Sequence, residues 1–111
     1  MNEMKTILAV GSIAIDTLQT PNGNRDNVLG GSATYFSLAA GLFSPVKLVG
    51  VVGNDYPQAG WKLFSSGNIN TDNVQVVDGK TFRWGGKYSH DYSERDTLFT
   101  ELGVFESFSP I

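Results

Sequence analysis

The sequence lacks cysteine altogether and has only one histidine, His90. Without cysteine the chain forms no disulfide and no thiolate zinc site, and it has no cysteine nucleophile. A single histidine cannot build a multi-histidine metal site, so we expect no metal to be bound. It also lies far along the chain from Ser12, Ser32 and Thr34, which argues against a Ser-His-Asp triad. We interpret His90 as a solvated turn residue.

The sequence also lacks a strong excess of charge of one sign and a long apolar run. Eight Lys and Arg residues stand against eleven Asp and Glu residues, giving a net charge of -3 with no basic patch for a nucleic acid. The apolar run Ile7–Val10 ends at Gly11, which is too short for a signal sequence or a membrane span. We therefore expect a cytoplasmic protein with no nucleic-acid or membrane partner.

The chain has 111 residues, 41% of them hydrophobic, and 13 glycines. This is the size of one turn-rich domain, but it is short for a complete small-molecule kinase or dehydrogenase. Residues 108–111 form a loop-like sequence with no closing element. We expect the chain to be a truncated product or a fragment of a longer fold.

The first two thirds of the chain predict alternating strands and helices. Residues 7–10 form a continuous apolar run, which is typical of a central strand buried on both faces. The elements expected after it are a hairpin of strands 13–18 and 27–29 with a turn at 21–24, a helix over 32–43 buried nearly all round, a buried strand over 46–53, and a helix capped by Asp55 that ends at Gly67. Parallel strands in this order are joined by right-handed crossovers.

The last third predicts short antiparallel strands instead. They cover residues 74–77, 81–84, 87–89 and 97–99, with a hairpin turn at Gly85-Gly86. The aromatic side chains Phe82, Trp84, Tyr88 and Tyr92 form either a lid that faces a ligand, a surface that faces a partner, or a core without ligand contact. Arg83 and Lys87 could meet a phosphate or lie on a solvated face, and the charged residues of 91–96 indicate a wet loop.

Two adjacent glycines, Gly30 and Gly31, open the helix predicted over residues 32–43. Glycine allows a close approach to the backbone, and the first turn of a helix offers free N–H groups at the positive end of its dipole. A polar or anionic ligand could rest there. Alternatively, the glycines make only a tight strand-to-helix turn with Ser32 as its cap.

Three separated motifs resemble the amino-terminal half of the ribokinase-like (PfkB) carbohydrate kinases. They are Gly11-Ser12-Ile13-Ala14-Ile15-Asp16, Gly30-Gly31-Ser32-Ala33-Thr34-Tyr35 and Val52-Gly53-Asn54-Asp55. The resemblance covers nearly the whole chain. It implies an α/β fold, a partial ribokinase-like domain over residues 1–111 with a Rossmann-like central parallel sheet. A small antiparallel β lid, with strands at approximately 13–29 and 74–100, would stand beside that sheet.

The resemblance also implies a function. Kinases of this family transfer the γ-phosphoryl group of ATP, with Mg²⁺, to a hydroxymethyl of a sugar or nucleoside, and the lid often forms a homodimer. Asp16 matches the carboxylate that accepts hydrogen bonds from substrate hydroxyls, and Gly30 and Gly31 match the backbone that lies against the sugar. The positions expected to contact substrate are Ser12, Ala14, Asp16, Gly30, Gly31 and Tyr35, with the lid candidates Phe82, Trp84 and Tyr88.

The sequence departs from the family pattern in two ways. The family commonly has an asparagine at the position of Tyr35 and often another near Ala14, and a tyrosine ring at that site favours a nucleoside, because rings stack. The carboxyl-terminal Asp-Thr-x-Gly-Ala-Gly-Asp motif, which supplies the catalytic base and anion hole, is not in these residues. We therefore expect the chain to hold substrate, to bind neither ATP nor Mg²⁺ by itself, and to be inactive alone.

Two other functions stay open. The turn at Gly11 after a buried strand is compatible with a Rossmann-type nucleotide-binding half, although the second and third glycines of Gly-x-Gly-x-x-Gly are missing. The aromatic β segment could instead be a non-catalytic binding or dimerisation module that pairs through exposed strand edges.

Overall fold

The computed structural model describes residues 5–109. The chain first alternates strands with helices, then continues in strands, and finishes in a short 3-10 helix. In chain order the elements are β1 Ile7–Val10, β2 Ala14–Thr20, β3 Gly23–Gly30, α1 Ser32–Ala40, β4 Val46–Gly53, α2 Gln58–Ser66, β5 Ile69–Val77, β6 Phe82–Tyr88, β7 Arg95–Glu101 and η1 Gly103–Ser107. They form two sheets that share no strand.

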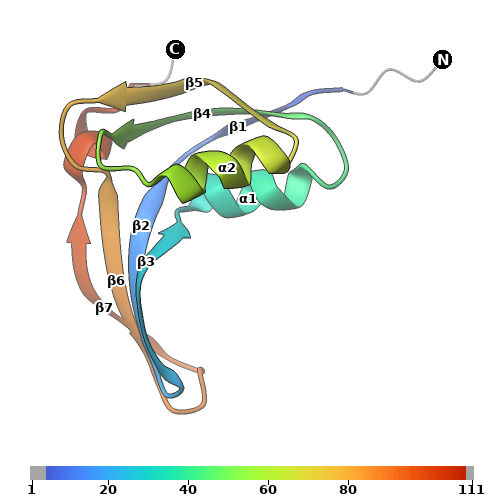
Figure 1. Ribbon diagram of the computed structural model, residues 1–111. Coiled ribbons are helices and arrows are strands. Elements are labelled where there is room, and N and C mark those ends of the chain that lie inside the picture. The colour runs from blue at the N-terminus through green and yellow to red at the C-terminus, as the bar shows by residue number, and fades with distance from the viewer. Residues whose placement is uncertain (1–4, 110–111) are drawn as a thin grey trace.

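The first sheet is parallel, with strand order β1-β4-β5. Figure 1 shows α1 and α2 next to each other on one face of it, with α1 against β1 and β4 and α2 against β5. The core lies between this face and the helices, where Leu48, Val52 and Phe64 are fully buried. The predicted strand–helix–strand–helix order and its parallel pairing are thus confirmed.

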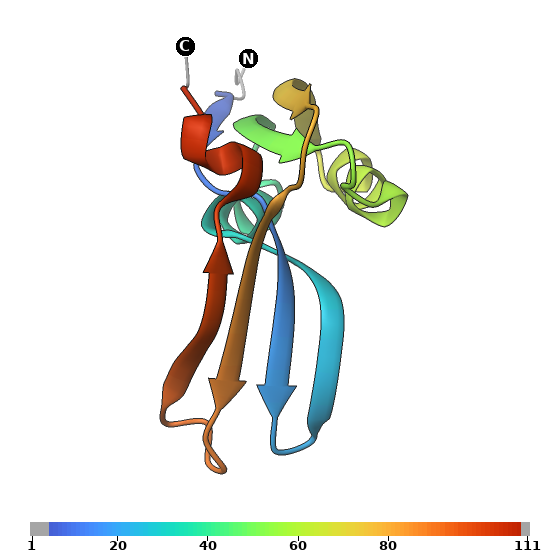
Figure 2. The ribbon, with the colours of Figure 1, turned by 90° about the vertical axis from the view of Figure 1, so that its left-hand side faces the viewer.

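The second sheet, called the lid below, has strand order β3-β2-β6-β7. Figure 2 shows it face-on, extending away from the helices. The β2–β3 pair is an antiparallel hairpin, as predicted. The β6–β7 pair is antiparallel, as predicted for the last third, and β2 and β6 pair in parallel at the centre. The lid thus joins two hairpins from distant parts of the sequence, and its outer strands β3 and β7 are edges within the described residues.

The prediction that residues 7–10 form a central strand buried on both faces is wrong. Within the described residues β1 is an edge strand, and Leu8 and Val10 are 63% and 50% exposed. The helices cover only one face of the parallel sheet, so alternate residues of β1 point away from them. The apolar run gave the correct element but not its surroundings.

Helix α1 is also less buried than predicted, and it ends at Ala40. Its buried residues are Ala33, Thr34 and Ser37, whereas Tyr35 and Phe36 are more than half exposed. The helix packs on β1 and β4 through small side chains, and only one stripe of a helix faces its neighbour.

Two predictions in the last third are wrong. Residues 74–77 end β5 of the parallel sheet and do not belong to the lid. No turn occurs at Gly85-Gly86, because β6 continues through both glycines and the hairpin turns later, where Ser89 N–H donates to the Glu94 carbonyl at 2.9 Å. Side chains cover the two glycines from opposite faces: the Trp84 ring lies where a Gly86 Cβ would stand, and the Phe99 ring does the same at Gly85.

Candidate functional site

A cavity of about 300 Å³ lies between the lid and the start of α1. It collects residues from β2, α1, β6 and β7, so the two hairpins of the lid and the first helix build it together. Its lining residues are Ser12, Ala14, Asp16, Leu18, Gly31, Ser32, Tyr35, Phe82, Trp84, Tyr88 and Arg95. Eight of the nine positions predicted to contact substrate line this one cavity, and the ninth, Gly30, lies directly behind Asp16.

Asp16 is the buried acidic group of this cavity. The residue is only 7% exposed, and within residues 5–109 no side chain or backbone group donates a hydrogen bond to its carboxylate. Burial raises the pKa of Asp16 above its ordinary value, because desolvation disfavours the charged form. The carboxylate oxygens are not among the fully buried polar atoms, so they face the cavity and are open to a ligand that supplies hydrogen-bond donors.

The two glycines allow Asp16 to occupy this place. A Cβ on Gly30 would collide with the Asp16 carboxylate, because β2 and β3 pair Ala14 with Gly30 and bring the acid against that strand. Gly31 has a φ of 94°, a conformation that L side chains rarely adopt, and a Cβ there would collide with the Ser12 carbonyl. Gly31 therefore makes the tight turn, and Gly30 leaves room for the acid.

Ser12, and not Ser32, satisfies the start of α1. The Ser32 N–H donates to the Ser12 hydroxyl at 3.0 Å, and the Ala33 N–H donates to the Ser12 carbonyl at 3.0 Å. The N-cap residue is Gly31, so the predicted Ser32 cap is wrong. Two free N–H groups of the helix are thus used within the chain, which makes this helix start a weaker anion site than an open one.

Aromatic rings form the lid side of the cavity. The Trp84 ring fills the space where a Gly86 Cβ would stand, and the guanidinium of Arg95 stands 5.0 Å from the centre of that ring. Phe82 stacks on Phe105 of η1 at 5.4 Å between ring centres. The rings thus have fixed neighbours and also border the cavity, and their contact with a ligand stays a prediction.

Tyr35 borders the cavity from α1. The residue is 54% exposed, and its hydroxyl lies within the electrostatic reach of Asp16. Burial, followed by the negative charge of Asp16 and the neighbouring Tyr88, raises the pKa of Tyr35 above its ordinary value. The hydroxyl is therefore a neutral donor and acceptor beside the acid at physiological pH.

Asp55 does not cap α2, whose N-cap is Pro57. Its Oδ1 accepts hydrogen bonds from the N–H and the hydroxyl of buried Thr81 at 2.8 and 2.7 Å, and its Oδ2 pairs with Arg83 at 3.3 Å. Burial opposes ionisation, but the hydrogen bonds from Thr81 and Arg83 together outweigh it and hold the pKa of Asp55 below its ordinary value. Asp55 therefore ties the end of β4 to the first residues of the lid strand β6, and Arg83 is an ion-pair partner.

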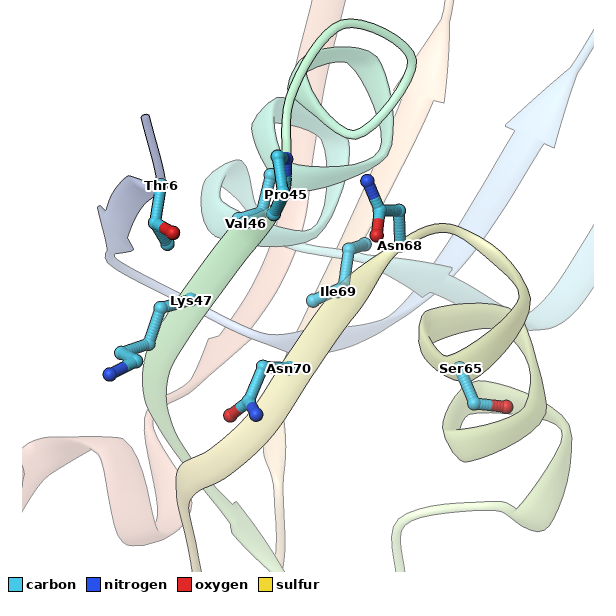
Figure 3. A pocket seen from close by; sticks show the side chains of 8 residues that line it. All are labelled: Thr6, Pro45, Val46, Lys47, Ser65, Asn68, Ile69 and Asn70. Carbon is cyan, nitrogen blue, oxygen red and sulfur yellow. The ribbon is translucent and has the colours of Figure 1, made fainter. Parts of the chain in front are cut away.

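A second hollow, of about 400 Å³, lies at the opposite end of the parallel sheet. Figure 3 shows that its side chains come from the starts of β4 and β5 and the end of α2, with Lys47 and Ser65 on opposite sides. Ligands of open α/β sheets bind beyond the carboxyl ends of the strands, whereas this hollow lies at their amino ends. It also has no carboxylate, so the smaller cavity at Asp16 is the better candidate site.

Several contributors to the cavity were not predicted as ligand contacts. Leu18 lies two residues beyond Asp16 on the same face of β2, so strand alternation could have identified it. Arg95 was interpreted as part of a wet loop, and no local signal marks it, because only the pairing of β6 with β7 brings it to Trp84. His90 is exposed at the tip of the lid, in agreement with its prediction as a turn residue.

Other site types find little support in the described part of the chain. Residues 5–109 contain no group of three or more histidine, cysteine or carboxylate side chains able to hold a metal ion. Over the same range, neither nine-residue helix has the length and apolar character needed to cross a membrane. After Gly11 the chain enters strand β2 and not a helix, which excludes the Rossmann-type dinucleotide turn at that position.

Comparison with known proteins gives consistent matches. No family model matches the sequence. The chain is 31% identical over 109 residues to cytidine kinase of Thermococcus kodakarensis, covering 97% of this chain and 38% of that protein. It superposes on ribokinase of Cryptococcus neoformans in complex with ADP with a TM-score of 0.78 at 22% identity, covering 93% of this chain and 35% of that one.

A nucleoside kinase of Burkholderia thailandensis in complex with inosine superposes with a TM-score of 0.75 at 19% identity, covering 93% of this chain and 37% of that one. The chain therefore spans little more than a third of the length of these relatives. Over the part that it spans, the chain has the fold of the ribokinase-like (PfkB) sugar and nucleoside kinases, and it resembles them in sequence.

Proposed function

We propose that this chain is the substrate-binding and lid portion of an ATP-dependent kinase that phosphorylates a hydroxymethyl of a nucleoside. The observation that carries the proposal is Asp16, a buried carboxylate without a protein partner that faces a cavity of about 300 Å³. An ionised carboxylate only accepts hydrogen bonds, and its two oxygens can take one from each of two neighbouring hydroxyls. Sugar rings present such pairs of hydroxyls.

The choice of a nucleoside over a simple sugar follows from the rest of the lining. Tyr35, Trp84 and Tyr88 border the same cavity as Asp16, and aromatic rings stack on a planar base. The curated relative named above is a cytidine kinase, and one of the solved neighbours holds inosine, which supports the same choice.

In this proposal the chain's residues hold and orient the substrate. Asp16 fixes the hydroxyls, Gly30 leaves room for the Asp16 carboxylate, Gly31 borders the cavity, and the lid limits the access of water to the substrate. We place the binding of ATP and Mg²⁺, and the catalytic base, outside these residues. The chain alone is then expected to bind substrate without turning it over.

Calorimetric titration of the purified chain with cytidine and with ribose tests the proposal. Asp16→Asn should weaken cytidine binding about 100-fold, since two charge-assisted hydrogen bonds contribute roughly 1.5 kcal/mol or more each. Asp26→Asn is the matched control, because Asp26 is exposed on the lid strand β3 and does not line the cavity. Equal affinities for the Asp16→Asn and wild-type proteins would remove Asp16 from the site.

An assay with ATP, Mg²⁺ and cytidine tests the division of labour. We expect no phosphorylated product from this chain alone. Turnover by the chain would contradict the assignment of phosphate binding and catalysis to residues outside it, while leaving substrate binding at Asp16 intact.

A further inference from the structure

The cavity at Asp16 has a second charged group, Arg95 of β7. Arg95 is an exposed residue whose side chain borders the cavity, and within residues 5–109 its guanidinium forms no ion pair and donates no hydrogen bond. The cavity is therefore lined by one unpaired acceptor, Asp16, and one unpaired fork of donors, Arg95. A ligand that matches both must offer donors to one group and acceptors to the other.

The backbone positions of Asp16 and Arg95 lie at different levels along the lid strands. Asp16 is level with Trp84 on β6, and Arg95 is level with Tyr88, four residues further along the same strand. Four residues of strand span about 13 Å, and the Arg95 side chain reaches back from there over the Trp84 ring. Arg95 has no charge effect on the ionisation of Asp16, which agrees with a separation of the two groups, so we expect a monosaccharide held at Asp16 to fill only the inner part of this path.

Trp84 is the aromatic neighbour of Arg95. Atoms of the indole ring stand where a Gly86 Cβ would lie, and the guanidinium stands over the same ring with its Cζ 5.0 Å from the ring centre. A guanidinium held over an aromatic face is planar and keeps its N–H donors at its edge. These donors are thus available to a neighbouring planar group with two adjacent acceptors.

We propose that Arg95 is the specificity-determining residue that recognises the acceptor edge of a nucleoside base while Asp16 holds the ribose. The inference rests on the proposed function and adds which part of the substrate is read by which residue. Cytosine presents a carbonyl oxygen beside a ring nitrogen, two adjacent acceptors that suit the arginine fork. A phosphorylated sugar would also offer acceptors, but it would leave the rings of Tyr35, Trp84 and Tyr88 without a partner.

The test is calorimetric titration of the full chain with cytidine, ribose and ribose 5-phosphate. Four proteins are compared: wild type, Arg95→Ala, Arg95→Lys and Arg25→Ala. Arg25 is the matched control, because it is an exposed arginine on the lid strand β3 that does not line the cavity.

Arg95→Ala should weaken cytidine binding about tenfold or more and change ribose binding by less than about twofold, because only cytidine reaches the guanidinium. Arg95→Lys should not restore cytidine binding, since a lysine lacks the planar fork. Arg25→Ala should behave as wild type.

Unchanged cytidine affinity in Arg95→Ala would overturn the inference, as would an equal loss for cytidine and ribose, which indicates a structural role. The inference would also be overturned if the wild-type chain bound ribose 5-phosphate more tightly than cytidine and Arg95→Lys kept the ribose 5-phosphate affinity that Arg95→Ala lost. That result would identify an anionic sugar as the ligand of Arg95. If the wild-type chain binds cytidine but Arg95→Ala does not selectively weaken that binding, the role of Arg95 is overturned and the proposed function stands. If the wild-type chain binds none of the three ligands, both the proposed function and the role of Arg95 are overturned.

Discussion

The two sheets of this chain use apolar side chains in different ways. In the parallel sheet, residues such as Leu48, Val52 and Phe64 are fully buried against α1 and α2. In the lid, the large side chains Phe82, Trp84 and Tyr88 are only partly buried, and they gather on the face that borders the Asp16 cavity. Residues of the first kind contribute stability, whereas residues of the second kind border the candidate site.

The two sheets meet at two short connections. The first runs from β1 through Ser12 into β2, and the second is the segment around Thr81 that leads into β6. Asp55 and the backbone of Gly53, at the end of β4, hold this second connection through Thr81. The cavity lies next to these connections, so its shape depends on how the lid is held against the parallel sheet.

Removing Phe64 should give the largest effect and should act through the parallel sheet alone. Phe64 is fully buried beside Tyr56 and Trp61, so Phe64→Ala should lower the free energy of unfolding by about 3–5 kcal/mol. The matched change in the lid, Trp84→Ala, should cost far less, because this ring is only partly buried. Urea unfolding curves measure both, and equal costs would contradict the distinction between the sheets.

Removing Asp55 should loosen the lid from the parallel sheet. Asp55→Ala leaves the buried N–H of Thr81 without an acceptor, which should cost about 2 kcal/mol in the free energy of unfolding. Because the pKa of Asp55 is lowered in the folded chain, its contribution is present above the ordinary value of 3.8 and is lost as the pH falls through the folded value. Chemical denaturation at neutral and acid pH should show the difference shrinking in acid. A constant difference would exclude the carboxylate as its source.

Adding a methyl group at each lid glycine should separate the two faces of the lid. Gly85→Ala meets the Phe99 ring and Gly86→Ala meets the Trp84 ring, so each should cost roughly 1–2 kcal/mol in the free energy of unfolding through overpacking. Only Gly86→Ala should also weaken nucleoside binding, because Trp84 borders the cavity and Phe99 does not. Denaturation curves measure the stability of the two variants, and calorimetric titration measures their nucleoside affinity. An equal loss of affinity in both would contradict a difference between the two faces of the lid.

The smallest effect should be a gain of stability at the site itself. The pKa of Asp16 is raised in the folded chain, so its favourable contribution is present below the ordinary value of 3.8 and is lost as the pH rises through the folded value. Asp16→Asn should therefore raise the free energy of unfolding at neutral pH by about 1 kcal/mol, and the gain should vanish in acid. Thermal unfolding at pH 7 and pH 3 gives the comparison. A destabilised variant at pH 7 would mean that the carboxylate has a partner.

Much of the fold could be predicted from local patterns. The apolar run of 46–53, the glycine and proline signals at residues 21–24, and the stop at Gly67 each gave the correct element or boundary. Local patterns failed where a distant segment supplied the context. Gly85-Gly86 has the composition of a turn, yet it lies inside β6 because the rings of Trp84 and Phe99 fill the space that its missing side chains leave.

In the candidate site, too, local patterns identified some features and the fold supplied the rest. Gly30 and Gly31 were identified from sequence as a place where a ligand or another group could approach the backbone. The structure adds that the Asp16 carboxylate itself fills the space beside Gly30, and that Ser12 uses the first donors of α1. At Asp55 the local pattern gave the wrong role. An acid before a helix is a good cap by composition, but Thr81, which is distant in sequence, lies close in the fold and donates two hydrogen bonds to this carboxylate.

The sequence by itself determined the residue types of the site: an acid on the strand after Gly11, a pair of glycines before a helix, and a set of aromatics near residues 82–92. Hydrophobic period and glycine position are local properties, so they could be identified without knowing the fold. The tertiary structure alone decided which of these residues share one cavity and that Arg95 joins them. Pairing of β2 with β6, and of β6 with β7, brings together segments that lie far apart in the chain, and no local pattern encodes that register.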